Sequence, residues 1–242
     1  SSSDDFDLSS NFGLSDIWIL ELTSTGEIEN DISFGGEGQD FCGAVLQPSA
    51  GGFFIAGYST SSTGAFAGNH GYTDGLAVRL DENFALQWLQ LYGGVDNDFV
   101  LGAALTPQDN FALIGMAASS AGDLPDNFGG FDAWLLEVDQ AGAIQHSKNY
   151  GGSEEDRLFD MVLANDDWLA IGSSYSSDLD VSDNYGLEDL WVVSLDPGFT
   201  AVEELEIIEL PLNISPNPAS TQIQLSLNRN PVQSGVVQIF NG

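Results

Sequence analysis

Short runs of apolar residues alternate with clusters of Gly, Asp, Asn and Ser along most of the chain. In the segment Trp134–Val138, the residues Trp134, Leu136 and Val138 occupy alternate positions, which is the period of a strand with one buried face. No stretch has sustained helical periodicity. The pattern therefore predicts an all-β protein. Within one part of the chain the expected strands are Val100–Thr106, Phe111–Ala117, Ala133–Val138 and Ile144–Tyr150.

Three markers recur in register about every 58 residues. They are an aromatic residue before Gly-Gly, an Asp that usually precedes x-Trp, and a lone Gly that ends an aliphatic run. The first begins at Phe34, Tyr92 and Tyr150; the second at Asp16, Asp74, Asp132 and Asp189; the third is Gly57, Gly115 and Gly172. Three markers that keep the same spacing identify an internal repeat.

Each repeat reads as four short strands, and a single sheet of this kind cannot bury both of its faces, so the sheets must stack. The sequence predicts a β-propeller-like array over 1–204. Its units are 1–36, which is partial, then 37–94, 95–152 and 153–204, the last with a degenerate final strand. This count gives 14 strands and no closed ring. Further blades before Ser1, a strand from elsewhere that completes the first sheet, or an open β-solenoid would each account for it. Since Ser1 falls within a repeat, we expect the natural chain to begin upstream.

Several repeat positions have an expected structural role. The residues at the start of the third strand should pack between sheets: Trp18, Leu76, Trp134 and Trp191. The aspartates after each Gly-Gly should cap the turn into the next first strand: Asp40, Asp98 and Asp156. The turns after the third strand should place Gly or Asn at positive φ: Thr25-Gly26, Glu82-Asn83 and Ala141-Gly142.

The long loop before each third strand repeats Asn, Gly and Asp at fixed positions. One interpretation is that these side chains hold the loop's own backbone, since Asn and Asp readily bond to nearby N–H groups. The other is a calcium site, because calcium takes six to eight oxygen ligands. The carboxylates that would form such sites are Asp123, Asp126 and Asp132 in one loop, and Asp178, Asp180, Asp183 and Asp189 in the next.

The charge balance is 37 Asp and Glu against 4 Lys and Arg, a net charge of -33. This charge repels phosphate backbones and anionic lipid surfaces, so we expect neither nucleic-acid binding nor membrane association. Cys42 is alone and can form no disulfide within the chain. No apolar run of about 18 residues predicts a membrane helix. The sequence also lacks the motifs of serine hydrolases, zinc proteases and phosphate-binding loops, so it predicts no enzyme.

The segment "GFFIAGYSTSS…GYTDGLAVRLDENFALQWLQLYGG" resembles the propeller-like repeats of surface proteins exported by the type IX secretion system. The resemblance covers nearly all of residues 3–200. It departs at Gly75-Leu76, where an aromatic residue is expected, and in the last unit, which lacks Tyr-Gly-Gly.

Residues 205–242 carry a second resemblance. The run Pro216-Asn217-Pro218 and the alternating apolar residues after it are similar to the sorting domain of type IX secreted proteins, a small β-sandwich. The terminal strands typical of that domain are missing, so the resemblance is to an incomplete one. It implies recognition by the type IX secretion machinery and a secreted or cell-surface location.

These observations predict a non-catalytic binding, adhesion or structural repeat protein. Its expected partners are a surface glycan, another protein or a second copy of the chain, and calcium is the only cofactor suggested. Two alternatives fit the same sequence: an accessory module of a secreted enzyme whose catalytic domain lies upstream, or a subunit of an extracellular filament or surface layer.

Overall fold

The computed structural model describes residues 11–125, 127–164, 167–196, 198, 202–204, 222–228 and 234–240. The chain divides into two compact units, Ser1–Glu204 and Leu205–Gly242. Within the described ranges, no helix is long and apolar enough to cross a membrane.

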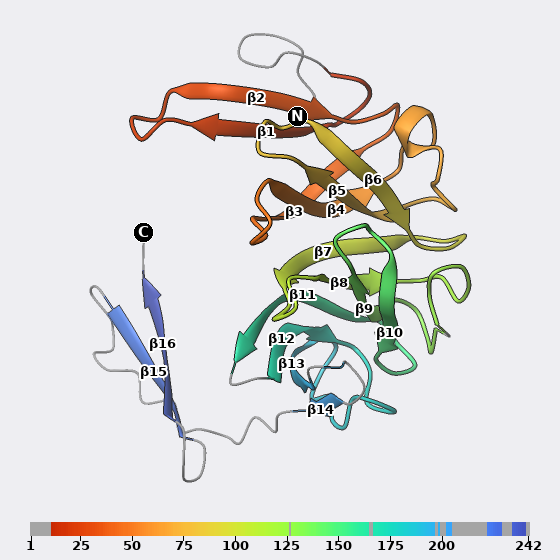
Figure 1. Cartoon of the computed structure of the whole chain (residues 1–242). Coiled ribbons are helices and arrows are strands. Elements are labelled where there is room, and N and C mark those ends of the chain that lie inside the picture. The colour runs from red at the N-terminus through yellow and green to blue at the C-terminus, as the bar shows by residue number, and fades with distance from the viewer. Residues whose placement is uncertain are drawn as a thin grey trace. The chain divides into compact units, whose positions relative to one another are not determined.

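The first unit is made of antiparallel sheets that follow the sequence repeat (Figure 1). A two-stranded sheet comes first, and three four-stranded sheets follow it. The strands are β1 (Ile17–Leu22) and β2 (Ile28–Phe34); β3 (Asp40–Leu46), β4 (Phe53–Ser59), β5 (Asp74–Leu80) and β6 (Leu86–Tyr92); β7 (Asp98–Leu105), β8 (Phe111–Ala117), β9 (Asp132–Val138) and β10 (Ile144–Tyr150); and β11 (Asp156–Ala164), β12 (Asp167–Ser174), β13 (Asp189–Leu195) and β14 (Val202–Glu204). The predicted four-stranded repeats are confirmed, as is the short final strand.

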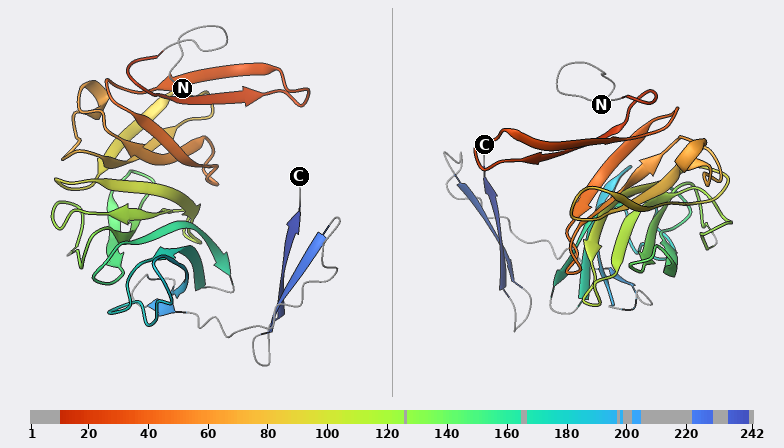
Figure 2. Two further views of the ribbon diagram at one scale, coloured as in Figure 1. Left: turned by 180° about the vertical axis from the view of Figure 1, so that it is seen from behind. Right: turned by 45° about the horizontal axis from the view of Figure 1, so that its top comes forward.

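The sheets stack face to face, and an apolar cluster fills each junction. The three clusters lie between consecutive sheets, and the middle one contains Phe54 and Phe111 from neighbouring second strands. Their rings stack with centroids 3.7 Å apart. The first strands β3, β7 and β11 contact one another in turn, so they form one side of the row (Figure 2). The described strands of this unit form a row of sheets and not a closed ring.

Residues at the start of the third strand behave as predicted at three of four positions. Leu76, Trp134 and Trp191 are buried at junctions between sheets. Trp18 is only partly buried, because it lies on the face of the first sheet that points away from the second. Its neighbour in the strand, Ile17, faces the junction and is buried.

The lone glycine of the second strand is required by a close backbone approach. A Cβ atom at Gly57, Gly115 or Gly172 would lie within 1.8 Å of a carbonyl oxygen in the first strand of the same sheet. At each of these places the register between first and second strand shifts by a residue. The bulge brings the first strand too near for any side chain, which explains this marker of the repeat.

The predicted turn geometry is correct at Gly26 and Gly142, which have φ of 86° and 82°. It is wrong in the repeat 37–94, where Phe84 and not Asn83 has positive φ, at 62°. Phe84 occupies the same repeat position as the two glycines. Its ring stacks on Phe53 with centroids 4.9 Å apart, and this contact offsets the unfavourable backbone conformation.

The second compact part of the chain, Leu205–Gly242, contains an antiparallel pair of strands, β15 (Gln222–Asn228) and β16 (Ser234–Phe240). The alternating positions Ile223 and Leu225 lie opposite Ile239 and Val237 in the register. The two strands expected from the alternation are therefore present. Pro216, Asn217 and Pro218, on which the sorting-domain resemblance depends, lie outside the described residues.

Two glycine substitutions should separate backbone strain from crowding. A Cβ at Gly26 meets nothing within 4 Å, so Gly26→Ala should cost only the left-handed conformation, about 1 kcal/mol. A Cβ at Gly142 lies 3.1 Å from Gln90 and 3.3 Å from Trp88, so Gly142→Ala should lower the melting temperature further. Gly68→Ala is the control, because Gly68 has open space and no positive φ. Equal melting temperatures for the Gly26 and Gly142 variants would contradict this ranking.

Candidate binding edge

The loops that precede the third strands leave the sheets on one side of the row (Figure 1). We call them the edge loops: residues 11–16, 69–74, 127–132 and 184–189. In each of them, the sequence positions Asn, Gly and Asp recur with the same spacing. Their hydrogen bonds show what the repeated polar residues do.

The asparagine of each edge loop hydrogen-bonds to the backbone around it. In the third sheet of the row, Asn127 Oδ1 accepts from the N–H of Gly129 at 3.0 Å, and its Nδ2 donates to the carbonyl of Ala117 at 3.0 Å. The same Asn–Gly bond occurs in the other loops, at 2.9–3.1 Å, for Asn11 with Gly13, Asn69 with Gly71 and Asn184 with Gly186. Each side chain thus replaces backbone partners that a loop lacks.

The aspartate that ends each edge loop accepts a hydrogen bond from the N–H four residues earlier. Asp74 Oδ2 accepts from the N–H of His70 at 2.8 Å and lies 2.8 Å from His70 Nδ1. The remaining pairs are Asp16 with Phe12, Asp132 with Phe128 and Asp189 with Tyr185. The first interpretation of the polar loop positions, that they hold the loop's own backbone, therefore describes their observed bonds.

A second set of buried carboxylates joins consecutive sheets, and we call them the junction aspartates: Asp40, Asp98 and Asp156. Asp98 Oδ2 accepts from Gly94 N at 2.8 Å and from Ser119 Oγ at 2.7 Å, and Oδ1 accepts from the N–H groups of Ala118 and Ser119, each at 3.1 Å. Asp40 and Asp156 make matching bonds to Gly36 and Ser61, and to Gly152 and Ser176. Their predicted role as caps of the turn after Gly-Gly is confirmed.

Five of the seven carboxylates named as a possible calcium site accept hydrogen bonds from different backbone N–H groups. Asp123 and Asp180 accept from the N–H groups of Gly93 and Gly151, at 3.2 and 3.3 Å, and Asp178 accepts from Ser153 N at 2.8 Å. Asp132 and Asp189 bond within their own loops. Asp183 is exposed, and Asp126 lies outside the described residues. In the part of the chain that the structure describes, no three His, Cys, Asp or Glu side chains are grouped to hold a metal ion.

The surroundings of Asp132 favour its protonated form. Burial raises the pKa of this carboxyl to about 7, and the nearby carboxylates of Asp156 and Asp180 add to the rise, although the N–H of Phe128 opposes it. One oxygen, Oδ1, is buried with no hydrogen-bond partner. Asp74 occupies the same repeat position, and burial raises its pKa as well, but there the backbone N–H and the ring of His70, which contact Oδ2, oppose the rise.

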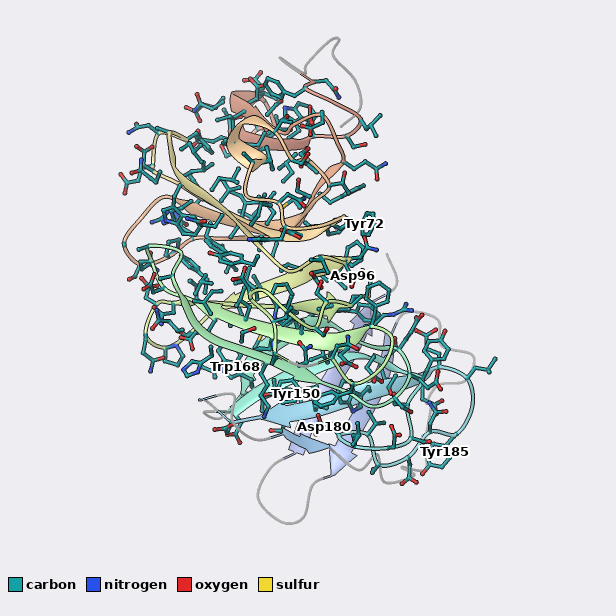
Figure 3. All side chains as sticks on the ribbon, turned by 90° about the vertical axis from the view of Figure 1, so that its right-hand side faces the viewer. Tyr72, Asp96, Tyr150, Trp168, Asp180 and Tyr185 are labelled. Carbon is teal, nitrogen blue, oxygen red and sulfur yellow. The ribbon has the colours of Figure 1, made fainter. Side chains whose placement is uncertain are left out.

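The edge loops also expose large apolar side chains, which the repeated polar residues of the sequence did not predict. Tyr72 is 70% exposed and Tyr185 is 89% exposed, and both lie on the same side of the molecule (Figure 3). The other exposed apolar residues of these loops are Phe12, Leu14, Phe128 and Leu187. They occupy the two variable positions of the repeated Asn-x-Gly-x. An aromatic or apolar residue that recurs at those positions is the signal in the sequence that could have found them.

The backbone beneath these side chains is fixed across the junctions. Tyr72 N donates to the carbonyl of Asp96 in the next unit at 3.3 Å, and Leu14 N donates to Gly38 at 3.0 Å in the same way. Tyr185 N donates to Asp189 within its loop. The exposed rings therefore stand on loops whose main chain is already ordered, so a ligand would meet them with little further loss of backbone entropy.

Comparison with known proteins does not assign the chain to a family. No protein-family model matches the chain, and no curated protein matches it. Similar solved structures include an ACO/RPE65 chimera, with 11% identity, a TM-score of 0.42, and coverage of 90% of this chain and 52% of that one. Two mutants of Synechocystis apocarotenoid oxygenase have TM-scores of 0.37 and 0.32, each with 11% identity and coverage of 97% of this chain and 49% of theirs. The chain spans about half the length of these structures, and TM-scores this low assign neither fold nor function.

The raised pKa of Asp132 should make stability fall as pH rises. In the unfolded chain this carboxyl loses its proton near pH 4, whereas the folded chain keeps it until about pH 7. The contribution of this carboxyl to the free energy of unfolding is therefore fully present below pH 4 and is lost as the pH rises from 4 to 7. Asp132→Asn should match the natural chain at pH 4 and melt at a higher temperature at pH 8. Asp183→Asn removes the same charge at an exposed site and is the control. A parallel pH dependence in the natural chain and Asp132→Asn would show that Asp132 is ionised throughout.

The two interpretations of the loop carboxylates are separated by melting in calcium and in magnesium. Because these carboxylates are bonded to loop N–H groups, we expect both ions to raise the melting temperature equally, through screening of the net charge. Asp180→Ala should melt at a lower temperature, since Gly151 N loses its acceptor, yet respond equally to both ions. A rise specific to calcium that Asp180→Ala abolishes would instead identify this loop as a calcium site.

Proposed function

We propose that the chain is a non-catalytic binding module, built from propeller-type blades, in which the edge loops recognise an extended ligand. The observation that carries this proposal is the pair of exposed rings, Tyr72 and Tyr185, on loops with an ordered backbone. Large exposed aromatic side chains on a fixed scaffold are typical of recognition surfaces, because they offer contact area at a low entropic cost.

The ligand that suits this edge best is a neutral glycan chain. Aromatic faces provide apolar contact area, and the surrounding carboxylates accept hydrogen bonds from hydroxyl groups. The net charge of -33 disfavours sulfated or phosphorylated polymers, since like charges repel. A row of similar loops, one for each repeat, suits a polymer whose own units repeat.

The proposed location is outside the cell, with export through the type IX secretion machinery. Support for this comes from the sequence alone, namely the repeat resemblance and the Pro216-Asn217-Pro218 run. The acidic composition is in keeping with a saline medium, where mobile ions screen the repulsion among carboxylates.

Electrophoresis through gels that contain neutral polysaccharides tests the binding function. We expect one of them to retard the natural chain, and Tyr72→Ala and Tyr185→Ala each to weaken the retardation, by roughly thirtyfold or more in affinity if each ring contributes as an interface hot spot. The double variant should migrate as in a gel without polysaccharide.

Phe159→Ala is the matched control, because Phe159 is an exposed aromatic residue on β11, away from the edge loops. Equal retardation of Tyr72→Ala, Tyr185→Ala and Phe159→Ala would show that the edge loops are not the binding surface. A natural chain that no neutral polysaccharide retards would contradict glycan recognition.

A further inference from the structure

A cavity of about 330 Å³ lies between two consecutive sheets, away from the edge loops. The edge loops lead into the starts of β5 and β9, whereas this cavity lies at the ends of the same strands. The turn after β3 supplies Gly51, the turn after β5 supplies Asp81 and Glu82, and the turn after β9 supplies Gln140. We call it the turn cavity. Its volume is in the range of sites that hold small molecules.

Two residues in the wall of the turn cavity depart from the repeat. Arg79 and Trp88 lie directly opposite each other in β5 and β6, and both line the cavity. The equivalent pairs in the neighbouring sheets are Glu21 with Asn30 and Glu137 with His146. An acidic residue is thus replaced by a basic one in this repeat alone. Positions that differ in one unit of a repeated scaffold are where recognition of a ligand can be added.

Arg79 is a partly buried cation in a chain that has only four Lys and Arg residues. Its guanidinium donates to the carbonyls of Phe53, Leu80 and Gly51, at 3.1, 2.6 and 2.5 Å. These bonds hold the turn after β3 and use three of the five N–H donors of the group. Among the described residues, no carboxylate oxygen lies within 4 Å of this guanidinium. A guanidinium that lines a cavity without a counterion is suited to a carboxylate from outside the chain.

Glu82 gives the turn cavity a negative group as well. Asp81 is engaged in its own turn, where it accepts from the N–H groups of Asn83 and Ala85 at 2.8 and 2.9 Å. Glu82 is exposed, and within the described part of the chain its carboxylate accepts no hydrogen bond. The cavity therefore offers one positive and one negative group to a ligand.

Trp88 provides an apolar wall whose position is fixed. Its Nε1 donates to the carbonyl of Gln140 at 3.1 Å, across the junction between the two sheets. The ring packs edge-on against Phe54, with centroids 6.0 Å apart. Gln140 in turn donates to the carbonyl of Asp109. Both sheets thus hold the ring before a ligand arrives, which limits the entropy lost on binding.

We propose that the turn cavity binds a small zwitterion, of the class of α-amino acids with an apolar side chain. The carboxylate of the ligand pairs with Arg79, its ammonium group pairs with Glu82, and its side chain lies against Trp88. A zwitterion has no net charge, so the charge of -33 does not repel it as it repels an anion. A sugar ring also suits a wall of aromatic and polar groups, but it supplies no counterion for Arg79. The proposal goes beyond glycan recognition and involves none of the edge loops.

Isothermal titration calorimetry of the whole chain with three matched compounds tests the proposal. L-phenylalanine carries both charges, 3-phenylpropionate carries only the carboxylate, and 2-phenylethylamine carries only the ammonium group. We expect L-phenylalanine to bind about tenfold or more tightly than 2-phenylethylamine, because a hydrogen bond to a charged group is lost without the carboxylate. We expect it to bind about two- to fivefold more tightly than 3-phenylpropionate, because the pair with an exposed carboxylate contributes less.

Two variants assign each charge of the ligand to a residue. Arg79→Gln should weaken binding of L-phenylalanine and 3-phenylpropionate and leave that of 2-phenylethylamine unchanged. Glu82→Gln should weaken binding of L-phenylalanine and 2-phenylethylamine and leave that of 3-phenylpropionate unchanged. Arg79→Gln also loses bonds to the turn, so its melting curve is measured first; if it does not fold, Glu82→Gln decides, because it breaks no bond within the described chain. Glu29→Gln is the matched control, since it removes the same charge at an exposed position of β2.

Three results would overturn the proposal. The first is that none of the three compounds binds. The second is that L-phenylalanine and 3-phenylpropionate bind with equal affinity, or that glucose binds as tightly as L-phenylalanine. The third is that Glu82→Gln and Glu29→Gln bind L-phenylalanine equally well. Tyr72→Ala and Tyr185→Ala should bind L-phenylalanine like the natural chain, so failure of this proposal is distinguishable from failure of glycan recognition.

Discussion

A buried carboxylate at the start of each first strand holds one sheet of the row to the next. Asp98 accepts from the Gly-Gly turn that ends the preceding unit and from the end of the second strand in its own sheet. A buried charge destabilises a protein unless its oxygens are hydrogen-bonded, and four donors meet this requirement at Asp98. Ser59 donates its hydroxyl to Asp40, and Ser174 donates its hydroxyl to Asp156. At the same repeat position beside Asp98 the chain has Ala117, which has no hydroxyl, and the N–H of Ala118 donates to Asp98 instead. The Gly-Gly turn between consecutive sheets is thus held by the first strand that follows it.

The strands, their grouping into four and the apolar positions at the junctions could be predicted from the sequence. Each of these depends on a period of two within strands and of about 58 between repeats, and both periods are visible without coordinates. The positive φ of Phe84 could not be predicted, because the stacking on Phe53 that offsets it joins residues 31 positions apart. How the row of sheets ends also depends on contacts that repeats cannot reveal, since each unit specifies only its own neighbours.

The candidate site was predicted only in part. The repeated polar residues indicated which loops are involved, but they did not indicate which side chains of those loops are exposed. Residues that recur at every repeat, such as Asn127 and Asp132, bond to the loop backbone and are therefore part of the scaffold. Tyr72 and Tyr185 occupy positions whose identity varies among units, and it is these positions that face solvent. In a repeat protein the constant positions maintain the fold, whereas the variable exposed positions are free to differ for recognition.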